Sequence, residues 1–511
     1  MKIKKWIFRS LLCVLFVSFL ILAIVIFTGC ENRQNLDLTH YTLNLSFDEN
    51  SKIVSGEEII NYKNQTDNTL SYAMFHLYPN AFREGAKISP VSLSNEHKAY
   101  PNGKSYGKIE IENIKLSGME CSLKLSDEDE VSSPSYQITG EDENILKINF
   151  TKELFPDENI EIEIKFNVVI PNIHHRFGYG NSTINLGNIY PIACVIENGK
   201  FKTDLYHYNG DPFYSEMSNY DVCLNLPEKF ICASSGEIVE ERTNNANKNL
   251  KILAENVRDF ALVLSEKYNV KTTEVDGTKI NYFYYDDSES EKSLEVAKEC
   301  ILTFNNLIGK YPYKIFNVAQ ANFVHGGMEY PNLVLISDDI VDHSQYEQVI
   351  VHETAHQWWY NLVGNSEYDN AWLDEGLTEY TTALFYELNP KYEIKKENLI
   401  KNAYSNYQLF VKVYEGAFGE VDTSINRKLN EYNSEQEYVY MAYVKGMLLF
   451  DNIREIIGLN KFKKCLKIYF EENKYKIASP ETLISAFEKG SGMKLENIFN
   501  AWINGKIIIL K

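Results

Sequence analysis

Two histidines and a glutamate lie in the chain at a spacing that could hold a metal ion and use it. The segment reads His-Glu-Thr-Ala-His, from His352 to His356. Positions i and i+4 share one face of a helix, so both imidazoles would point at one spot and could bind one Zn²⁺. Glu353 lies between them and could take a proton from a water that the metal has made more acidic. Such a motif arises by chance in roughly one or two of every hundred chains this long, and the alternative is a surface helix with two unrelated histidines.

A third metal ligand is offered by Glu375, which follows His356 after eighteen intervening residues. Two antiparallel helices joined by a loop of that length could bring Glu375 to the metal. Two histidines and one glutamate leave a fourth position open for water, which is the catalytic arrangement, whereas a structural zinc site is closed, usually by thiolates. No cysteine lies nearby. We therefore expect one Zn²⁺ per chain, held by His352, His356 and Glu375.

Glu379 lies one helical turn beyond Glu375. It could hydrogen-bond a ligand imidazole and fix its tautomer. The alternative is an exposed carboxylate on the surface of the helix.

The elements before this motif are mostly strands, from His40 to about residue 265. Apolar residues alternate with polar ones from Tyr41 to Phe47, which is typical of a half-buried strand. Similar short runs recur at Ile145–Phe150, Ile160–Phe166, Tyr220–Leu226 and Phe260–Leu264. The acidic segment Ser126–Glu143 is expected to be a solvated loop. The first half is therefore predicted to be an antiparallel β domain.

The second half is predicted to be mainly helical. Apolar residues from Leu294 to Ile308 are spaced by three and four, as on an amphipathic helix, and Ser288 or Ser290 could cap it. Further helices are expected at Tyr346–Leu362, Leu373–Leu388, Lys396–Tyr414, Gln436–Ile457 and Pro480–Lys489. We place the boundary between the two domains near residue 267.

The N-terminus has the order of an export signal. Basic residues from Lys2 to Arg9 precede an apolar run over residues 11–27, and Cys30 follows the small residue Gly29. This order resembles the bacterial lipobox, in which the cysteine becomes the lipidated first residue of the mature protein. The alternative for residues 1–29 is an uncleaved membrane anchor. Both interpretations place the rest of the chain on the outer face of the membrane, because the positive flank stays in the cytoplasm.

Charge and cysteine content restrict the remaining possibilities. The net charge of −20 over 511 residues argues against a nucleic-acid partner, which requires a basic face. The cysteines after the leader have no tight metal-binding spacing. Cys223 and Cys232 flank a probable turn and could face each other, but buried free thiols are an equally good interpretation.

A glycine-rich segment upstream of the zinc motif reads Gly-Gly-Met-Glu-Tyr, from Gly326 to Tyr330. Together with the zinc motif it resembles the M1 (gluzincin) aminopeptidases, whose signature pairs GxMEN with HExxH, eighteen residues and Glu. Tyr330 replaces the usual Asn. The resemblance implies that Gly327, Met328 and Glu329 bind substrate, with Glu329 on its free α-amino group. A carboxylate suits that role, because a buried ammonium needs an opposite charge.

The resemblance extends to a tyrosine ahead of a Lys-Gly pair, here Tyr443 before Lys445 and Gly446. It implies that the Tyr443 hydroxyl donates to the oxyanion that forms during peptide hydrolysis. Tyr438 and Tyr440 are close in sequence, so the alternative is that Tyr443 is packed core and a neighbour acts instead.

The fold that the resemblance implies is an α+β multidomain protein. An N-terminal antiparallel β saddle domain over residues 30–267 would precede a mainly α thermolysin-like zinc peptidase domain over residues 268–511. The family's Pro-Cys-x-Asp-Glu-Pro segment is not recognisable, which leaves the second residue that holds the amino group unassigned. The chain also ends where many members continue into a large helical domain, so we expect an open cleft that admits peptides of varied length.

The function expected from these features is a zinc aminopeptidase that removes N-terminal residues from peptides outside the cytoplasmic membrane. Its partners would be peptides with a free N-terminus and the membrane, reached through the lipid or the anchor. Two alternatives keep the same metal site: an endopeptidase, or the epoxide-opening chemistry of one branch of the family. A third alternative is an inactive surface module that binds peptides.

Overall fold

The strands of the first half form because apolar and polar residues alternate along them. In the computed structural model, which describes residues 36–124 and 134–507, the first strand buries Tyr41, Leu43, Leu45 and Phe47 and turns the residues between them outward. This agrees with the predicted alternation. The predicted leader, residues 1–29, and the predicted lipidation residue, Cys30, lie outside the described residues.

The first half is made almost entirely of strands. They are β1 (Thr39–Asp48), β2 (Ile53–Lys63), β3 (Leu70–His76), β4 (Lys108–Leu116), β5 (Met119–Glu120), β6 (Ser122–Leu123), β7 (Ser135–Thr139), β8 (Ile145–Leu154), β9 (Asn159–Val169), β10 (Phe177–Tyr179), β11 (Ile184–Gly187), β12 (Ile192–Ala193), β13 (Ile196–Glu197), β14 (Lys200–Phe201), β15 (Ser218–Pro227), β16 (Ile231–Ser234), β17 (Glu237–Asn244), β18 (Asn247–Val257) and β19 (Ala261–Ser265). Two short helical segments interrupt them, Tyr78–Phe82 and α2 (Glu96–Ala99).

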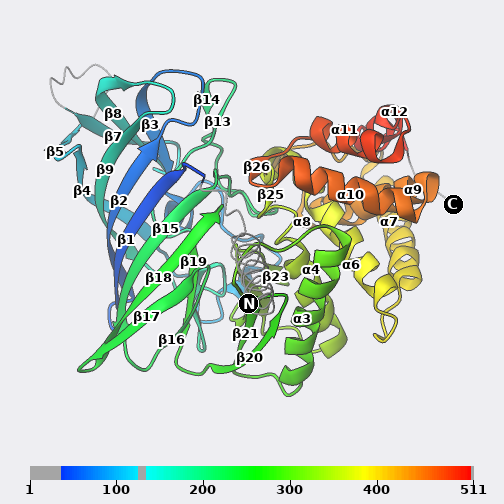
Figure 1. Cartoon of the computed structure of the whole chain (residues 1–511), viewed down its shortest axis with the longest axis horizontal. Coiled ribbons are helices and arrows are strands. Elements are labelled where there is room, and N and C mark those ends of the chain that lie inside the picture. Colours follow the sequence, from blue (N-terminus) through cyan, green and yellow to red (C-terminus); the bar gives the residue numbers. More distant parts are fainter. Residues whose placement is uncertain (1–35, 125–133, 508–511) are drawn as a thin grey trace, which may run out of the picture. The chain divides into compact units, whose positions relative to one another are not determined.

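Three larger sheets contain most of these strands, and β13 and β14 form a separate two-stranded sheet. The largest has the order β17-β18-β15-β1-β2-β9-β4-β5, and Figure 1 shows β1, β2, β15 and β18 as long strands side by side. Smaller sheets have the orders β12-β3-β8-β7-β6 and β10-β11-β19-β16. Most neighbours are antiparallel, as predicted, but β1 and β15 are parallel, from the pair Thr39 and Ser218 onward. Chain-distant segments can pair in either direction, and a local apolar pattern does not encode the choice.

The second half contains both helices and strands. Its strands are β20 (Asn269–Val275), β21 (Thr278–Tyr284), β22 (Ile315–Ala321), β23 (Gly327–Met328), β24 (Leu333–Ser337), β25 (Val363–Gly364) and β26 (Lys476–Ile477). Its helices are α3 (Ser290–Leu307), α4 (His343–Ala355), α5 (Glu367–Asn370), α6 (Glu375–Leu388), α7 (Lys396–Phe418), α8 (Glu435–Tyr438), α9 (Gly446–Ile457), α10 (Leu459–Asn473), α11 (Pro480–Ser491) and α12 (Glu496–Ile503). The predicted order, a β domain followed by a mainly helical one, is therefore confirmed.

A five-stranded sheet in the second half was not predicted. Its order is β20-β21-β22-β24-β23, which places β23 at an edge. Every residue of β22 and β24 is buried. Strands that are buried on both faces lack the alternation of apolar and polar residues that identifies a half-buried strand, so the sequence pattern does not separate them from helix.

Several predicted boundaries were wrong in detail. The helix expected at Tyr346–Leu362 ends at Ala355, and the one expected at Gln436–Ile457 is divided into α8, a π-helical segment over Val439–Lys445, and α9. β7 lies inside the segment that was expected to be a loop. Glu289, rather than Ser288 or Ser290, is the residue that precedes α3, and it makes no side-chain cap.

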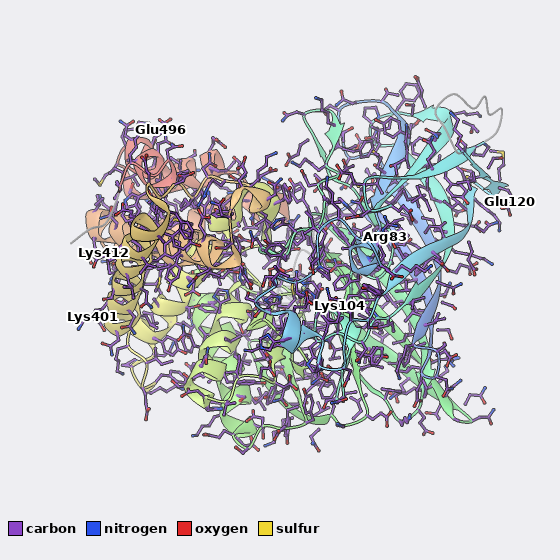
Figure 2. The ribbon with its side chains drawn as sticks, turned by 180° about the vertical axis from the view of Figure 1, so that it is seen from behind. Arg83, Lys104, Glu120, Lys401, Lys412 and Glu496 are labelled. Carbon is purple, nitrogen blue, oxygen red and sulfur yellow. The ribbon has the colours of Figure 1, made fainter. Side chains whose placement is uncertain are left out.

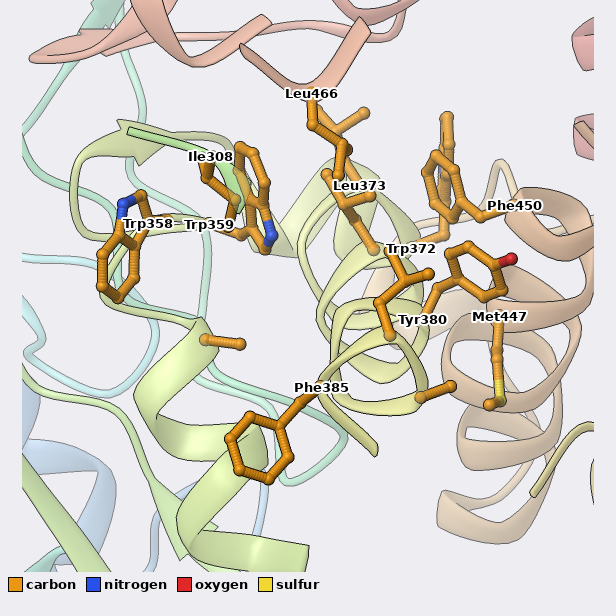
Figure 3. Packing of buried hydrophobic residues seen from close by; sticks show 14 of the residues in the cluster. Ile308, Trp358, Trp359, Trp372, Leu373, Tyr380, Phe385, Met447, Phe450 and Leu466 are labelled. Atoms are coloured by element: carbon orange, nitrogen blue, oxygen red, sulfur yellow. The ribbon is translucent and has the colours of Figure 1, made fainter. Parts of the chain in front are cut away.

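The helical core is built around aromatic side chains. Trp358 and Trp372 are fully buried, and Figure 3 shows them with Trp359, Tyr380 and Phe450 between the helices. Burying one side chain of this size contributes about 2–3 kcal/mol. Trp358 and Trp359 lie just after α4 and Trp372 lies just before α6, so this core fixes the two helices that carry the predicted metal ligands.

Contacts between the two halves are buried and polar. The Arg258 guanidinium donates to the carbonyl of Ser215 at 2.8 Å in the first half, and to those of Tyr360 at 3.1 Å and Lys476 at 3.0 Å in the second. Residues 38–511 accordingly form one compact unit.

In Figure 2, Lys401 and Lys412 of α7 lie on the helical half.

Two further observations concern the surface and the thiols. All six cysteines in the described part of the chain are free, so Cys223 and Cys232 do not pair; Cys223 is exposed and Cys232 is buried. Among the residues described, no helix is both long and apolar enough to cross a membrane.

Candidate metal centre and substrate pocket

Helix α4 carries the first two predicted ligands. It begins after Asp342, whose side chain accepts a hydrogen bond from the Gln345 amide at 2.9 Å, as an N-cap does. It ends at Ala355, which leaves His356 as the residue after the last turn. The Nε2 atoms of His352 and His356 nevertheless lie 3.1 Å apart, because the i and i+4 positions still share one face.

Helix α6 supplies the third predicted ligand at its first residue. The Asp374 side chain caps this end by accepting from the Glu375 amide at 2.9 Å. Glu375 Oε2 lies 3.4 Å from His352 Nε2 and 3.2 Å from His356 Nε2. The three donor atoms lie within 4.8 Å of one another, so the structure brings together all three residues that the sequence nominated.

The outer nitrogens of both imidazoles also have partners. His356 Nδ1 lies 3.1 Å from the Trp359 carbonyl and 3.3 Å from Thr378 Oγ1. His352 Nδ1 lies 3.3 Å from Glu379 Oε1. Partners on the far nitrogen orient a ligating imidazole and leave Nε2 free for a metal. Glu379 is thus placed where the sequence-based hypothesis put it.

This donor set fits a zinc ion. Two imidazole nitrogens and one carboxylate oxygen, with no thiolate and with space beyond them, are the ligands of a catalytic zinc site. Burial alone would raise the pKa of Glu375, but the two neighbouring histidines lower it, so this carboxylate stays ionised as a ligand must.

Glu353 lies beside the three ligands in a nearly dry position. Its side chain is buried, and its Oε2 has no hydrogen-bond partner. A Cβ at Gly327 would lie 2.3 Å from Glu353 Oε1, so only glycine leaves room for this carboxylate. Burial raises the pKa of Glu353 to about 8, which is the direction that a carboxylate needs to accept and return a proton near neutral pH.

Glu329 lies immediately after edge strand β23, which pairs with β24 through Gly327 and Met328. Glu329 is 3% exposed and its Oε1 has no hydrogen-bond partner. Met328 is buried in the core of the first half rather than at the pocket surface. A buried carboxylate without a partner is costly, and a cationic group of a ligand would stabilise it.

Tyr330, which replaces the family's Asn, anchors this segment to the first half. Its hydroxyl donates to Asn188 Oδ1 at 2.9 Å, and Asn188 in turn donates to Asp259. A Cβ at Gly187 would lie 1.8 Å from the Tyr330 hydroxyl, so Gly187 makes room for it. A tyrosine fits at position 330 because Gly187 leaves space for its ring and Asn188 accepts a hydrogen bond from its hydroxyl.

Tyr443 lies in the π-helical segment and donates to Glu375 Oε1 at 2.5 Å. Its ring stacks on that of His352, with centroids 6.0 Å apart. Widened turns of this kind often occur at functional sites, because they redirect one side chain. Tyr440, one of the two alternatives, instead stacks on Phe410 with centroids 4.5 Å apart, whereas Tyr438 lines the pocket.

Three charged residues of the site were not predicted from the sequence. Arg176 is buried and bonds Asp211, and the carboxylate oxygens of Asp211, Glu367 and Glu375 lie within 4.8 Å of one another. Glu367 is fully buried, and neither of its oxygens has a hydrogen-bond partner. The sequence contains only a weak indication of these residues, because the Gly-Asp-Pro segment that contains Asp211 is typical of an ordinary turn.

One cavity of about 380 Å³ lies at this site. Its walls include every predicted metal ligand together with Gly327, Glu329, Glu353, Glu379 and Tyr443. Other lining residues come from the first half and from α8, such as Asn95, Tyr208 and Glu435. The pocket is therefore formed by both halves of the chain.

Fold and donor set define a two-domain protein with a buried centre for one metal ion, formed by two histidines and a glutamate. Residues 292–502 match the model of the peptidase family M1 domain.

Relatives of known name agree with this assignment. The chain is 23% identical to Aminopeptidase M1-A of Oryza sativa subsp. japonica over 301 residues, which is 55% of this chain and 34% of that protein. It is 25% identical to Aminopeptidase M1 of Arabidopsis thaliana over 311 residues, which is 57% of this chain and 34% of that protein. The chain thus covers about a third of the length of these relatives.

Solved structures share the whole two-domain fold. An M1 zinc metallopeptidase mutant from Deinococcus radiodurans superposes with a TM-score of 0.63 at 15% identity, covering 94% of this chain and 97% of that one. The same mutant bound to a Tyr-Ser-Ala substrate gives the same values. At this level of identity the likeness concerns the fold.

Proposed function

We propose that the protein is a zinc aminopeptidase that hydrolyses the first peptide bond of peptides with a free N-terminus. The observation that carries the proposal is the convergence of the three donor residues, Glu353 and Glu329 on one cavity of about 380 Å³. The aminopeptidase names of the relatives support it.

Each residue has a role that its surroundings favour. When bound by His352, His356 and Glu375, Zn²⁺ would supply Lewis acidity to the scissile carbonyl and to the attacking water. Glu353 takes the proton of that water and passes it to the leaving amine, and its raised pKa suits both transfers. Burial raises the pKa of Tyr443, so its hydroxyl keeps its proton and donates it in a hydrogen bond to the developing oxyanion.

Glu329 would make the enzyme an exopeptidase. Its unpartnered, buried oxygen binds the substrate's ammonium and so holds the first peptide bond beside Glu353. An acetylated peptide lacks this charge and would leave the Glu329 carboxylate without a partner.

The test uses the full chain in detergent with aminoacyl fluorogenic amides, each free or N-acetylated, before and after treatment with a zinc chelator. Release from the free amides alone, abolished by the chelator and restored by added Zn²⁺, is the expected result. Cleavage of acetylated peptides would favour an endopeptidase. No cleavage of any substrate by protein that contains zinc would favour a peptide-binding module.

We further propose that the protein acts on the outer face of the cytoplasmic membrane. The support is the basic, apolar and cysteine-ending order of residues 1–30. Cells expressing the full chain or Cys30→Ser would be grown with a labelled fatty acid and fractionated. Label on the wild type alone is expected. Membrane-bound but unlabelled wild type would favour the uncleaved anchor, and soluble unlabelled protein would contradict both.

A further inference from the structure

Glu435 lines the same pocket as the metal centre and has no role in the proposed reaction. It is the first residue of α8, and its side chain is 23% exposed. Asn95 Nδ2 lies 3.0 Å from both of its oxygens, and Ser92 Oγ donates to one of them. His325 Nδ1 lies 3.5 Å away. These contacts hold the carboxylate in place from two separate segments, one with Ser92 and Asn95 and the other with His325.

Two of these partners fix Glu435 without an opposite charge, because the amide of Asn95 and the hydroxyl of Ser92 are neutral donors. Burial alone would raise the pKa of Glu435, but the interactions with His325, Ser92 and Asn95 outweigh burial and lower the pKa. The carboxylate therefore presents a negative charge to the pocket near neutral pH.

The other acidic residues of the pocket already have partners or roles. The carboxylates that line it are Asp211, Glu329, Glu353, Glu375, Glu379 and Glu435. Asp211 bonds Arg176, and Glu375 and Glu379 contact the histidines. Glu353 and Glu329 serve the water and the ammonium in the proposed function. Among the described residues, this leaves Glu435 as the pocket carboxylate that a second cationic group of a substrate could meet.

Glu435 and Glu329 line the same cavity, so the second cationic group is assigned to the side chain of the first residue. His325, which contacts Glu435, lies four residues before Glu329 on the same segment. An ammonium held at Glu329 therefore places the first side chain in the same cavity. Tyr438 and the half-exposed Val439 follow on the same wall and would pack along the alkyl part of a long basic side chain.

We infer that Glu435 makes the pocket select peptides whose first residue is lysine or arginine. The inference rests on the proposed function and specifies its substrate class. The Glu435 carboxylate would pair with the side-chain ammonium or guanidinium, while Glu329 binds the α-amino group. A charged pair that is partly shielded from water favours the basic residue over a neutral one of equal length by about tenfold to a hundredfold.

The test compares basic substrates with uncharged analogues. The wild-type full chain would be assayed for kcat/KM on lysyl and norleucyl amides, and on arginyl and citrullyl amides. Citrulline keeps the size of arginine without its charge, and norleucine keeps the carbon chain of lysine without its ammonium group. The basic member should be favoured at least tenfold, and the preference should fall as salt is added. Equal or better hydrolysis of the neutral members would overturn the inference.

Variants distinguish the effect of the Glu435 charge from the effect of the contacts that hold its side chain. Glu435→Gln should bring both ratios close to one while norleucyl hydrolysis changes less than about threefold, because the isosteric amide still accepts from Asn95. Asn95→Ala keeps the charge and should keep the preference. Glu420→Gln removes an exposed charge from the loop after α7 and should change nothing. A preference that survives Glu435→Gln would refute the assignment, whereas failure on every free amide would refute the proposed aminopeptidase instead.

Discussion

Glu353 is the residue on which the proposed chemistry depends most directly. It is buried beside the three donor residues but provides none of the donor atoms, and Gly327 leaves space for its carboxylate. Replacing Glu353 with Gln keeps the shape and removes the proton acceptor, so we expect kcat to fall by about 10²–10⁴-fold. The zinc content, measured by atomic absorption, should stay at one ion per chain.

The matched control for this substitution is Glu420→Gln, which removes the same charge from an exposed position. It should leave kcat and zinc content unchanged. Near-normal turnover in Glu353→Gln would show that another group accepts the proton. Loss of zinc together with loss of activity would instead give Glu353 a role in holding the metal.

Tyr330 offers a second test at this scale, because its hydroxyl donates to the buried Asn188. Tyr330→Phe leaves Asn188 Oδ1 without that donor, so we expect a loss of about 1–3 kcal/mol in the free energy of unfolding. Since Glu329 is the preceding residue, KM should also rise. Urea denaturation and initial-rate kinetics measure the two effects.

Tyr440→Phe is the matched control, since its ring stacks on Phe410 and the substitution preserves the ring. It should cost less than about 0.5 kcal/mol. If Tyr330→Phe behaves like this control, the contact to Asn188 does not contribute to stability.

The site residues that the sequence predicted are those that lie close to one another along the chain. His352, Glu353 and His356 lie within two turns of chain, so helical periodicity alone places them together. Arg176 and Asp211 are 35 residues apart, and both are far in sequence from Glu375. No periodic pattern connects residues that only the packing of two halves brings together, and Glu367 was missed for the same reason.

At the scale of elements, two helices approach unusually closely behind the metal centre. A Cβ added at Gly376 of α6 would lie 2.7 Å from the Cα of Gly446 of α9, and the reverse is also true. The contact places Glu375 and Tyr443 side by side, because each is within three residues of one of these glycines. The Lys-Gly pair recognised in the sequence therefore has a packing role.

Gly446→Ala should force α6 and α9 apart. We expect a loss of about 1–3 kcal/mol in stability from overpacking, together with a lower kcat because the Tyr443 hydroxyl moves away from Glu375. Thermal unfolding followed by circular dichroism measures the first effect and steady-state kinetics the second.

Gly416→Ala in α7 is the matched control, because a Cβ there meets nothing within 4 Å. Alanine has the higher helix propensity, so this variant should be neutral or up to about 1 kcal/mol more stable. Equal effects of the two substitutions would mean that the close approach of the helices is not important.

Element boundaries near the site were the part of the fold that the sequence predicted least well. The apolar pattern after His356 continues through Trp358, Trp359 and Leu362, so helix was expected, but these residues are buried from several sides without helical structure. The π-helical segment at Val439–Lys445 was missed for a related reason, since one widened turn changes the phase of the pattern too little to be seen.

At the scale of the whole molecule, the two halves meet at adjacent charged residues that follow β18. Arg258 donates to carbonyls of both halves, and Asp259 accepts from Asn188, Tyr190 and its neighbouring backbone. Through Asn188 and Tyr330 the Asp259 carboxylate is linked to the segment that carries Glu329. The ionisation of the buried Asp259 therefore affects the contacts between the two halves that form the pocket.

Asp259 should make stability depend on pH. Burial raises its pKa from 3.8 to about 7 in the folded protein, although three hydrogen bonds oppose the shift. Between these values the folded state holds more protons than the unfolded state. The contribution of Asp259 is therefore complete below about pH 4 and is lost as the pH rises through about 7, with an upper limit of about 4 kcal/mol.

Urea denaturation of the wild type and of Asp259→Asn at pH 5 and pH 8 isolates the contribution of Asp259. The difference between the two proteins in the free energy of unfolding should shift in favour of the variant at the higher pH. Asp67→Asn, at an exposed position, should run parallel to the wild type. Parallel behaviour of Asp259→Asn as well would mean that Asp259 stays ionised across this range, held so by its hydrogen-bond donors.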